Sequence, residues 1–295
     1  MLTDELVARV RRIELTTRKL VSDGFAGEYH SVYKGRGMEF DEVRQYVPGD
    51  DVRSIDWNVT ARTGQPHVKR YVEERELTVM LAVDLSGSGD FGTRERFKRD
   101  LAVELAAVLS FAATTNNDRV GLLLFTDRVE LLIPPRKGRN HVLRMLRELL
   151  AFQPDGTRTD ISFALDTIYA LLKRRSIVFL ISDFLADPES YRQPMVVANR
   201  RHDVAGFDLS DPLEREMPDV GIVAMEDAET GQLRWVDTGN ADWRREFGER
   251  VVGLERQKGE VFAAAGVDRV RMSTGEDYVA RIAAFFRDRL RRPAR

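Results

Sequence analysis

The feature that most constrains the fold is a series of apolar segments separated by amphipathic stretches. Residues 77–84, LTVMLAVD, are almost continuously apolar, which is typical of a strand buried on both faces of a parallel sheet. Further candidate strands follow at 120–125, 129–133, 176–183, 203–209 and 267–272. Helical patterns lie between most of them, at 94–115, 138–151, 160–174, 188–200, 241–264 and 276–291. This alternation predicts an α/β fold, a mostly parallel sheet flanked by helices and joined by right-handed crossovers.

Two places depart from the alternation. Only three residues separate 120–125 from 129–133, so we expect a hairpin with an antiparallel edge strand. Residues 211–238 interrupt the pattern with a second predicted hairpin, which turns at 229–231. Because it follows a strand, this insertion leaves the sheet at the carboxyl end, where α/β folds usually keep their sites.

The N-terminal part has a different texture. Residues 3–22 predict an amphipathic helix that is capped by Thr3 and ended by Gly24 and Gly27. Residues 28–75 carry dense charge, a turn signal at 48–50 and an extended segment at 67–73, and predict a small strand-containing region.

We therefore expect a helix and strand-containing region over 1–76 and an α/β domain over 77–295 that carries the hairpin insertion at about 211–238. We also expect a small accessory β region that combines 28–75 with the hairpin at 219–237.

Charge and cysteine content exclude several classes of protein. The chain has 46 basic and 48 acidic residues, a net charge of −2, and no cysteine. Disulfide scaffolds, thiolate metal sites and cysteine nucleophiles are therefore excluded. Near neutrality argues against nucleic acid as a partner. Acids near the start and an apolar stretch too short to span a bilayer predict a soluble, cytoplasmic protein with no membrane span.

Polar side chains follow the predicted strands where the strands end. Asp84 and Asp183 close two strands, and Ser86 and Ser88 follow the first of them at alternate positions. A later loop, PDGTRTD, places Thr157 or Thr159 just before a helix. Oxygen donors gathered at one sheet edge suit Mg²⁺. The alternative is that these residues only cap helices.

The ordered set Asp84-x-Ser86-x-Ser88, Thr159 and Asp183 resembles the metal-ion-dependent adhesion site of von Willebrand factor type A domains, over about 77–290. The upstream block GRGMEFDEVRQYVPGDDVRSIDWNVTAR resembles the hallmark of the bacterial domain of unknown function 58. Such proteins are typically encoded beside MoxR-type AAA+ ATPases and are thought to act with them as adaptors or chaperone-like factors.

This resemblance implies a non-enzymatic, metal-dependent protein-interaction module with a Rossmann-like α/β fold. Ser86, Ser88 and Thr159 would bind Mg²⁺ directly, whereas Asp84 and Asp183 would bind mainly through water. A partner's Asp or Glu would complete the shell. Thr157 stays an alternative to Thr159, and Mn²⁺ or Ca²⁺ alternatives to Mg²⁺.

The upstream block supplies candidate partner-docking residues. Those singled out are Arg44, Tyr46, Asp50, Arg53, Asp56 and Trp57. Tyr, Trp and Arg are common at binding hot spots. The alternative, which we favour, is a framework of ion pairs and turns that supports this part of the fold.

Two rival functions remain. A Mg²⁺-dependent phosphatase would use Asp84 as its nucleophile, but such enzymes need a second acid two residues later, where this chain has Ser86. A metal-free scaffold would use the serines only as caps. The chain lacks a G-x-x-x-x-G-K-[ST] loop, so ATP hydrolysis would belong to a partner.

Overall fold

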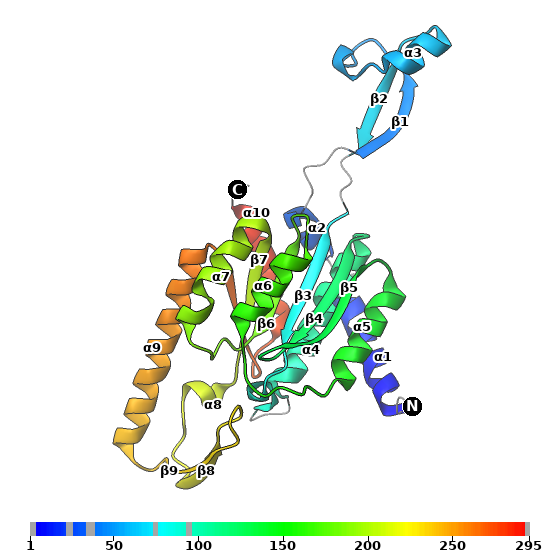
Figure 1. Cartoon of the computed structure of the whole chain (residues 1–295). Coiled ribbons are helices and arrows are strands. Elements are labelled where there is room, and N and C mark those ends of the chain that lie inside the picture. Colours follow the sequence, from blue (N-terminus) through cyan, green and yellow to red (C-terminus); the bar gives the residue numbers. More distant parts are fainter. Residues whose placement is uncertain (1–3, 22–25, 34–38, 73–75, 93–95, 293–295) are drawn as a thin grey trace. The chain divides into compact units, whose positions relative to one another are not determined.

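A computed structural model describes residues 4–21, 26–33, 39–72, 76–92 and 96–292 (Figure 1). The chain forms two compact units. One contains residues 1–32 and 78–295, and the other contains residues 33–77. The N-terminal helices therefore belong with the α/β unit, whereas the single boundary expected at 76 would have grouped them with the charged block.

The α/β unit is built on a six-stranded sheet. Its strands are β3 (Thr78–Asp84), β4 (Arg119–Phe125), β5 (Val129–Arg136), β6 (Ile177–Ser182), β7 (Asp203–Ser210) and β10 (Asp268–Ser273). Their order across the sheet is β10-β7-β6-β3-β4-β5, and every neighbouring pair is parallel except β4 and β5. The predicted mostly parallel sheet with an antiparallel edge strand is confirmed.

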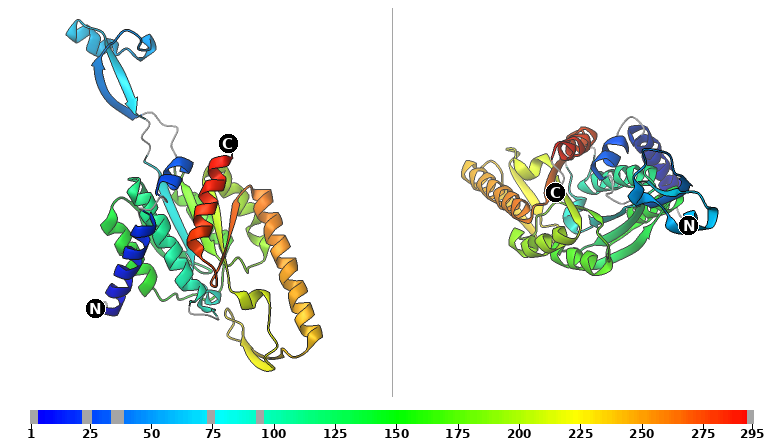
Figure 2. Two further views of the ribbon diagram at one scale, coloured as in Figure 1. Left: turned by 180° about the vertical axis from the view of Figure 1, so that it is seen from behind. Right: turned by 90° about the horizontal axis from the view of Figure 1, so that it is seen from above.

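Helices cover both faces of this sheet (Figures 1 and 2). They are α4 (Lys98–Thr115), α5 (Arg139–Ala151), α6 (Ile161–Leu171), α7 (Pro188–Arg201), α9 (Ala241–Ala265) and α10 (Tyr278–Arg291). Met80 and Ala82, at alternate positions of β3, share a core with α6, α7 and α9. Helix α4 contacts β3 and β4, and α1 (Asp4–Leu20) packs on α4 and α5. The result is a Rossmann-like α/β fold, as predicted.

The predicted N-terminal helix is present as α1. The region after it differs from the prediction. Gly27 lies inside a second helix, α2 (Ala26–Tyr33), where we expected a helix end and then strands. Burial of Tyr29 explains this helix: its ring meets Phe286 edge-on at 5.8 Å, and its hydroxyl donates to Asp118 at 2.9 Å. Thr3 and Gly24 lie outside the described residues.

The predicted insertion is present in the α/β unit. It begins with the short helix α8 (Pro212–Arg215) and continues into β8 (Ile222–Glu226) and β9 (Leu233–Asp237), which pair antiparallel. The Asp227 carboxylate accepts from the backbone N–H groups of Glu229 and Thr230, both at 3.0 Å, and so closes the turn.

The second unit is a hairpin of β1 (Glu39–Gln45) and β2 (His67–Val72), with η2 (Val52–Ser54) and α3 (Trp57–Thr63) in its connection. The predicted turn at 48–50 is present, with Gly49 at φ +113°. In the described residues this hairpin and β8–β9 are each a two-stranded sheet. The expected combination of the two hairpins in one β region stays a prediction.

None of the helices in the described ranges has the length and apolar character needed to cross a membrane.

Candidate metal centre

The order of the strands brings two distant sequence segments together. After β3 the chain builds β4 and β5 on one side, and then returns to place β6 on the other side of β3. Such a reversal of strand order opens a crevice at the carboxyl ends of the strands, where open α/β sheets bind ligands. Asp84 is the last residue of β3 and Asp183 directly follows β6, so both reach this point.

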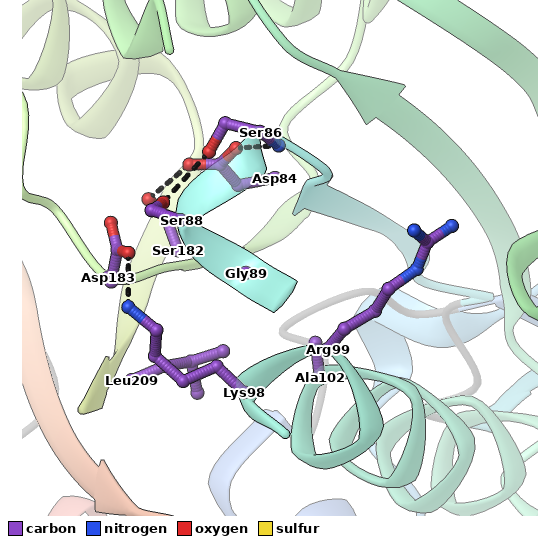
Figure 3. Close-up of a pocket in the computed structure, with 10 residues that line it drawn as sticks. All are labelled: Asp84, Ser86, Ser88, Gly89, Lys98, Arg99, Ala102, Ser182, Asp183 and Leu209. Carbon is purple, nitrogen blue, oxygen red and sulfur yellow. Dashed lines mark hydrogen bonds and ion pairs between the residues drawn. The ribbon is translucent and has the colours of Figure 1, made fainter. Parts of the chain in front are cut away.

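The loop after β3 folds back on Asp84 (Figure 3). The Oδ1 atom of Asp84 accepts from the backbone N–H of Ser86 at 2.9 Å, the local turn that aspartate favours. Its Oδ2 atom accepts from the Ser182 hydroxyl of β6 at 2.6 Å. The hydroxyl oxygens of Ser86 and Ser88 lie 3.1 Å apart. The structure thus gathers these predicted donors at one edge of the sheet.

Asp183 lies beside a buried cation. The Lys98 ammonium of α4 donates to Asp183 Oδ2 at 2.7 Å, and the backbone N–H of Leu185 donates to Oδ1 at 3.2 Å (Figure 3). A cavity of about 10 Å³ lies at this point, and Asp84, Ser86, Ser88 and Asp183 are among the residues that line it. That volume accommodates a single water molecule or ion.

The two carboxyl groups differ in acidity. Desolvation, with the negative charge of Asp183, raises the pKa of Asp84 to about 7. Desolvation also acts on Asp183, but the Lys98 ammonium and hydrogen bonds outweigh it and lower the pKa of Asp183. At neutral pH Asp183 is therefore ionised, while Asp84 is divided between its two forms. A divalent cation in the cavity would favour the ionised form of both.

The two candidate threonines have different surroundings. Thr157 donates its hydroxyl to the backbone carbonyl of Glu229, in the turn of the β8–β9 hairpin, at 2.9 Å. The Oγ1 atom of Thr159 is buried and has no hydrogen-bond partner within the described part of the chain. Buried hydroxyls are normally satisfied, so of the two threonines Thr159 is the one whose hydroxyl is available to bind a metal ion. Thr159 does not line the small cavity itself.

The threonine loop is held against the serine loop. The Gly87 N–H donates to the Thr157 carbonyl at 2.9 Å. Gly87 also lies against the hairpin turn, since a Cβ there would stand 2.0 Å from the Ala228 carbonyl oxygen. Behind the loop, the Glu130 carboxylate of β5 accepts from the Gly156 N–H at 2.8 Å. The loop that carries Thr159 is thus fixed from two sides.

The donor set suits a hard cation. All five predicted ligands offer oxygen, and three are neutral hydroxyls, as Mg²⁺ sites tolerate. Among the residues that the structure describes, no group of three or more His, Cys, Asp or Glu side chains could hold a metal, so any ion here depends on the hydroxyls. Two observations agree with such a site: the ion-sized cavity, and the Thr159 hydroxyl, which none of the described residues satisfies.

Three of the proposed docking residues already have hydrogen-bond or ion-pair partners within the second unit. The Arg44 guanidinium makes a bidentate ion pair with Asp50, at 2.8 and 2.6 Å, and Asp50 also accepts from the Val47 N–H. The hydrogen bond from Arg44 lowers the pKa of Asp50. Asp56 caps α3 by accepting from two backbone N–H groups. These residues support the turn and the helix, as the framework interpretation predicts.

The other docking candidates are more accessible. Trp57 is 68% exposed and Arg53 is exposed, whereas Tyr46 is half-buried and its N–H donates to the Pro66 carbonyl at 2.9 Å. Among the docking candidates, Arg44, Asp50 and Asp56 are therefore engaged within the unit, whereas Arg53 and Trp57 are exposed.

Sequence reasoning missed three residues that shape the site. Ser182 donates to Asp84, Lys98 pairs with Asp183, and Glu130 holds the threonine loop. Ser182 could have been found from its place before Asp183 at the end of the strand. Lys98 and Glu130 carry no local signal, because their partners lie on other elements.

These observations define a Rossmann-like α/β protein with a small polar site at the carboxyl edge of its sheet. The chain belongs to the family described as protein of unknown function DUF58, whose model matches residues 42–257.

The relatives cover nearly the whole chain. The uncharacterized protein Rv1480 of Mycobacterium tuberculosis is 36% identical over 289 residues, which are 97% of this chain and 90% of that protein. The uncharacterized protein Mb1516 of Mycobacterium bovis matches to the same extent.

Two solved structures share the fold. The conserved hypothetical protein BatB of Bacteroides thetaiotaomicron aligns with a TM-score of 0.51 at 15% identity, over 72% of this chain and 98% of that chain. An aerotolerance-related membrane protein of Bacteroides fragilis aligns with a TM-score of 0.52 at 14% identity, with the same coverage. At this identity the likeness concerns the fold alone.

Proposed function

We propose that this protein is a non-enzymatic, metal-dependent protein-interaction module of the von Willebrand factor type A kind. A Mg²⁺ ion at the carboxyl edge of the sheet would capture a carboxylate of a partner protein. The observation that carries the proposal is the meeting of oxygen donors from β3 and β6 around an ion-sized cavity. The buried hydroxyl of Thr159, which has no hydrogen-bond partner among the described residues, supports it.

The proposed ligands divide into two sets. Ser86, Ser88 and Thr159 would bind the ion directly and add no negative charge. Asp84 and Asp183 would bind mainly through water. An ion held by neutral oxygens keeps strong attraction for an incoming anion, which is the physical reason for a carboxylate as the last ligand. Mn²⁺ and Ca²⁺ are alternatives to Mg²⁺ that share its preference for oxygen.

The partner that we propose is a MoxR-type AAA+ ATPase in the cytoplasm, with this chain as its adaptor or chaperone-like factor. This part rests on the resemblance of the residues 35–62 and of the Asp84-x-Ser86-x-Ser88 set to families encoded beside such ATPases. Catalysis by this chain is not proposed, because Ser86 stands where a phosphatase of the aspartate type needs its second acid.

The test is binding of a purified MoxR-type ATPase of the same organism to the immobilised full chain, without nucleotide. We expect binding in Mg²⁺ that is lost in EDTA and lost in Asp84→Ala. The ATPase alone in each buffer is the control for its own response to Mg²⁺. Retention of Mg²⁺-dependent binding by a folded Asp84→Ala protein would contradict the mechanism.

A metal-free scaffold is the second candidate, because one observation favours it. Asp84 already accepts hydrogen bonds from Ser86 and Ser182, and Asp183 already has Lys98 as its counter-ion. A site so satisfied can fold without an ion. This candidate predicts that partner binding is the same in Mg²⁺ and in EDTA.

A further inference from the structure

Lys98 stands where a lysine is not expected. It is 1% exposed, and it is the first residue of α4. Lysine is almost never fully buried unless it is paired, and the helix dipole disfavours a cation in the first turn. The Lys98 ammonium lies over the Phe91 ring at 5.9 Å, and its ion pairs compensate for the burial of its charge.

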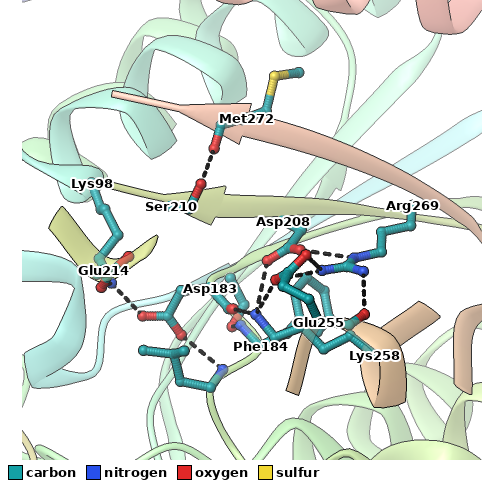
Figure 4. Close-up of polar contacts among 12 residues, drawn as sticks. Lys98, Asp183, Phe184, Asp208, Ser210, Glu214, Glu255, Lys258, Arg269 and Met272 are labelled. Atoms are coloured by element: carbon teal, nitrogen blue, oxygen red, sulfur yellow. Dashed lines mark hydrogen bonds and ion pairs between the residues drawn. The ribbon is translucent and has the colours of Figure 1, made fainter. Parts of the chain in front are cut away.

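Those ion pairs join two parts of the α/β unit (Figure 4). The Lys98 ammonium lies 2.7 Å from Asp183 Oδ2 and 2.5 Å from Glu214 Oε1. Glu214 belongs to α8, and its other oxygen accepts from the Asp211 N–H at 2.9 Å, which closes the capping box of that helix. One ammonium therefore links a proposed metal ligand to the start of the 211–238 insertion.

A second buried lysine has a different role. Lys258 of α9 donates to the backbone carbonyl of Asp183 at 2.6 Å and lies 3.3 Å from Asp208 (Figure 4). Asp208 is also paired with Arg269. Lys258 thus fixes the backbone at Asp183, whereas Lys98 neutralises its carboxylate.

We propose that Lys98 is the internal cation that sets the metal affinity of this site. It would compete with the divalent ion for Asp183, and metal binding would shift its ammonium toward Glu214. The inference rests on the proposed function, because it assumes that Asp183 is a ligand. It adds a residue outside the five ligands and connects metal occupancy with α8.

Two substitutions should change the Mg²⁺ affinity in opposite directions. Lys98→Met removes the positive charge that pairs with Asp183 and keeps a similar side-chain length. Mg²⁺ should therefore bind at least about 10-fold more tightly, since a cation beside a ligand carboxylate repels the incoming ion. Glu214→Gln removes the second acid and leaves the ammonium wholly to Asp183, so Mg²⁺ should bind more weakly. Glu104→Gln is the matched control, because Glu104 lies on the same helix and pairs with Arg96 at 2.8 Å.

The measurement is calorimetric titration of Mg²⁺ into the full chain and each variant at about pH 8, above the pKa of about 7 of Asp84. Circular dichroism checks that each variant is folded. Tighter binding by Lys98→Met and weaker binding by Glu214→Gln, with Glu104→Gln unchanged, supports the inference. If Lys98→Met does not fold, weaker binding by Glu214→Gln alone supports it.

Other results overturn one of the two proposals. Binding by folded Lys98→Met that equals or is weaker than wild type overturns the role of Lys98 and leaves the metal site standing. Unchanged binding by Glu214→Gln has the same consequence. Failure of the wild type and every variant to bind Mg²⁺ overturns the proposed function, and with it the inference.

Discussion

The sheet edge at β3 and β6 and the charged block of the second unit are both rich in polar residues, but the structure uses them differently. In the block, Arg44 and Asp50 satisfy each other, and Asp56 satisfies the first turn of α3. At the sheet edge, Asp84 has a raised pKa and Thr159 keeps a buried hydroxyl without a partner in the described residues. The two regions show that a high density of polar residues does not by itself indicate a site. The raised pKa of Asp84 and the unsatisfied Thr159 hydroxyl are what distinguish the sheet edge from the charged block.

The largest expected effect is a difference in Mn²⁺ affinity between variants of the two threonines on one loop. Thr159→Ala should weaken Mn²⁺ binding by at least about 10 to 100-fold, because even residues that only orient a metal ligand contribute that much. Thr157→Ala should leave it unchanged, since that hydroxyl is occupied by Glu229. Titration of Mn²⁺ followed by electron paramagnetic resonance measures both. Equal losses in the two variants would show that the loop, rather than the Thr159 hydroxyl, matters.

The next effect concerns pH. The folded-state pKa of Asp84 is raised from 3.8 to about 7, so the folded protein binds this proton more tightly than the unfolded chain. The metal-free protein should therefore lose stability as pH rises through that window. Asp84→Asn should remove this loss and be more stable at pH 8 by about 2 kcal/mol, part of the desolvation cost of the carboxylate.

Urea unfolding at several pH values in EDTA checks this prediction. Without metal, the wild type should be less stable than Asp84→Asn at pH 8. Added Mg²⁺ should remove this deficit in the wild type, because the ion favours ionised Asp84. If Asp84→Asn is less stable than the wild type at every pH, burial of the ionised Asp84 carboxylate does not destabilise the folded protein, and the prediction is wrong.

A smaller effect belongs to the second unit. Asp56→Ala removes the acceptor for the Asn58 and Val59 N–H groups, at 2.9 and 3.3 Å, and should destabilise α3 by about 1 kcal/mol. Hydrogen exchange of residues 57–63 measures this change, and Mg²⁺ affinity should stay the same. Weaker metal binding in this variant would contradict the view that the second unit takes no part in the metal site.

The smallest expected change in stability is that of Trp57→Ala. With 68% of its surface exposed, Trp57 should contribute less than about 0.5 kcal/mol to the free energy of unfolding. Thermal unfolding gives that value, and the ATPase binding assay gives the other readout. Unchanged binding would agree with the framework interpretation, whereas loss of binding at full stability would make this residue part of the docking surface.

Much of the fold could be predicted because it depends on local patterns. The apolar run 77–84 is β3 within one residue, and the three-residue connection before β5 predicted its antiparallel pairing. The helix α2 was missed, because it is only eight residues long and contains Gly27. Its burial depends on Tyr29 meeting Phe286, a contact that no local pattern reveals.

The candidate site was predictable to the same degree. Asp84 and Asp183 could be placed together, because parallel strands end at one edge. The choice between Thr157 and Thr159 could not be made, since both are hydroxyls on one loop and only the hairpin turn distinguishes them. Lys98 reads in sequence as an ordinary helix-surface lysine, and its burial between Asp183 and Glu214 is purely tertiary.

The most direct test of the account is calorimetric titration of Mg²⁺ and Mn²⁺ into the wild type and Asp84→Ala, with circular dichroism of both. The account predicts one binding site per chain in the wild type and none in a mutant that keeps its fold. Equal binding by the two proteins, or no binding by the wild type, would contradict the assignment of this sheet edge as a metal centre.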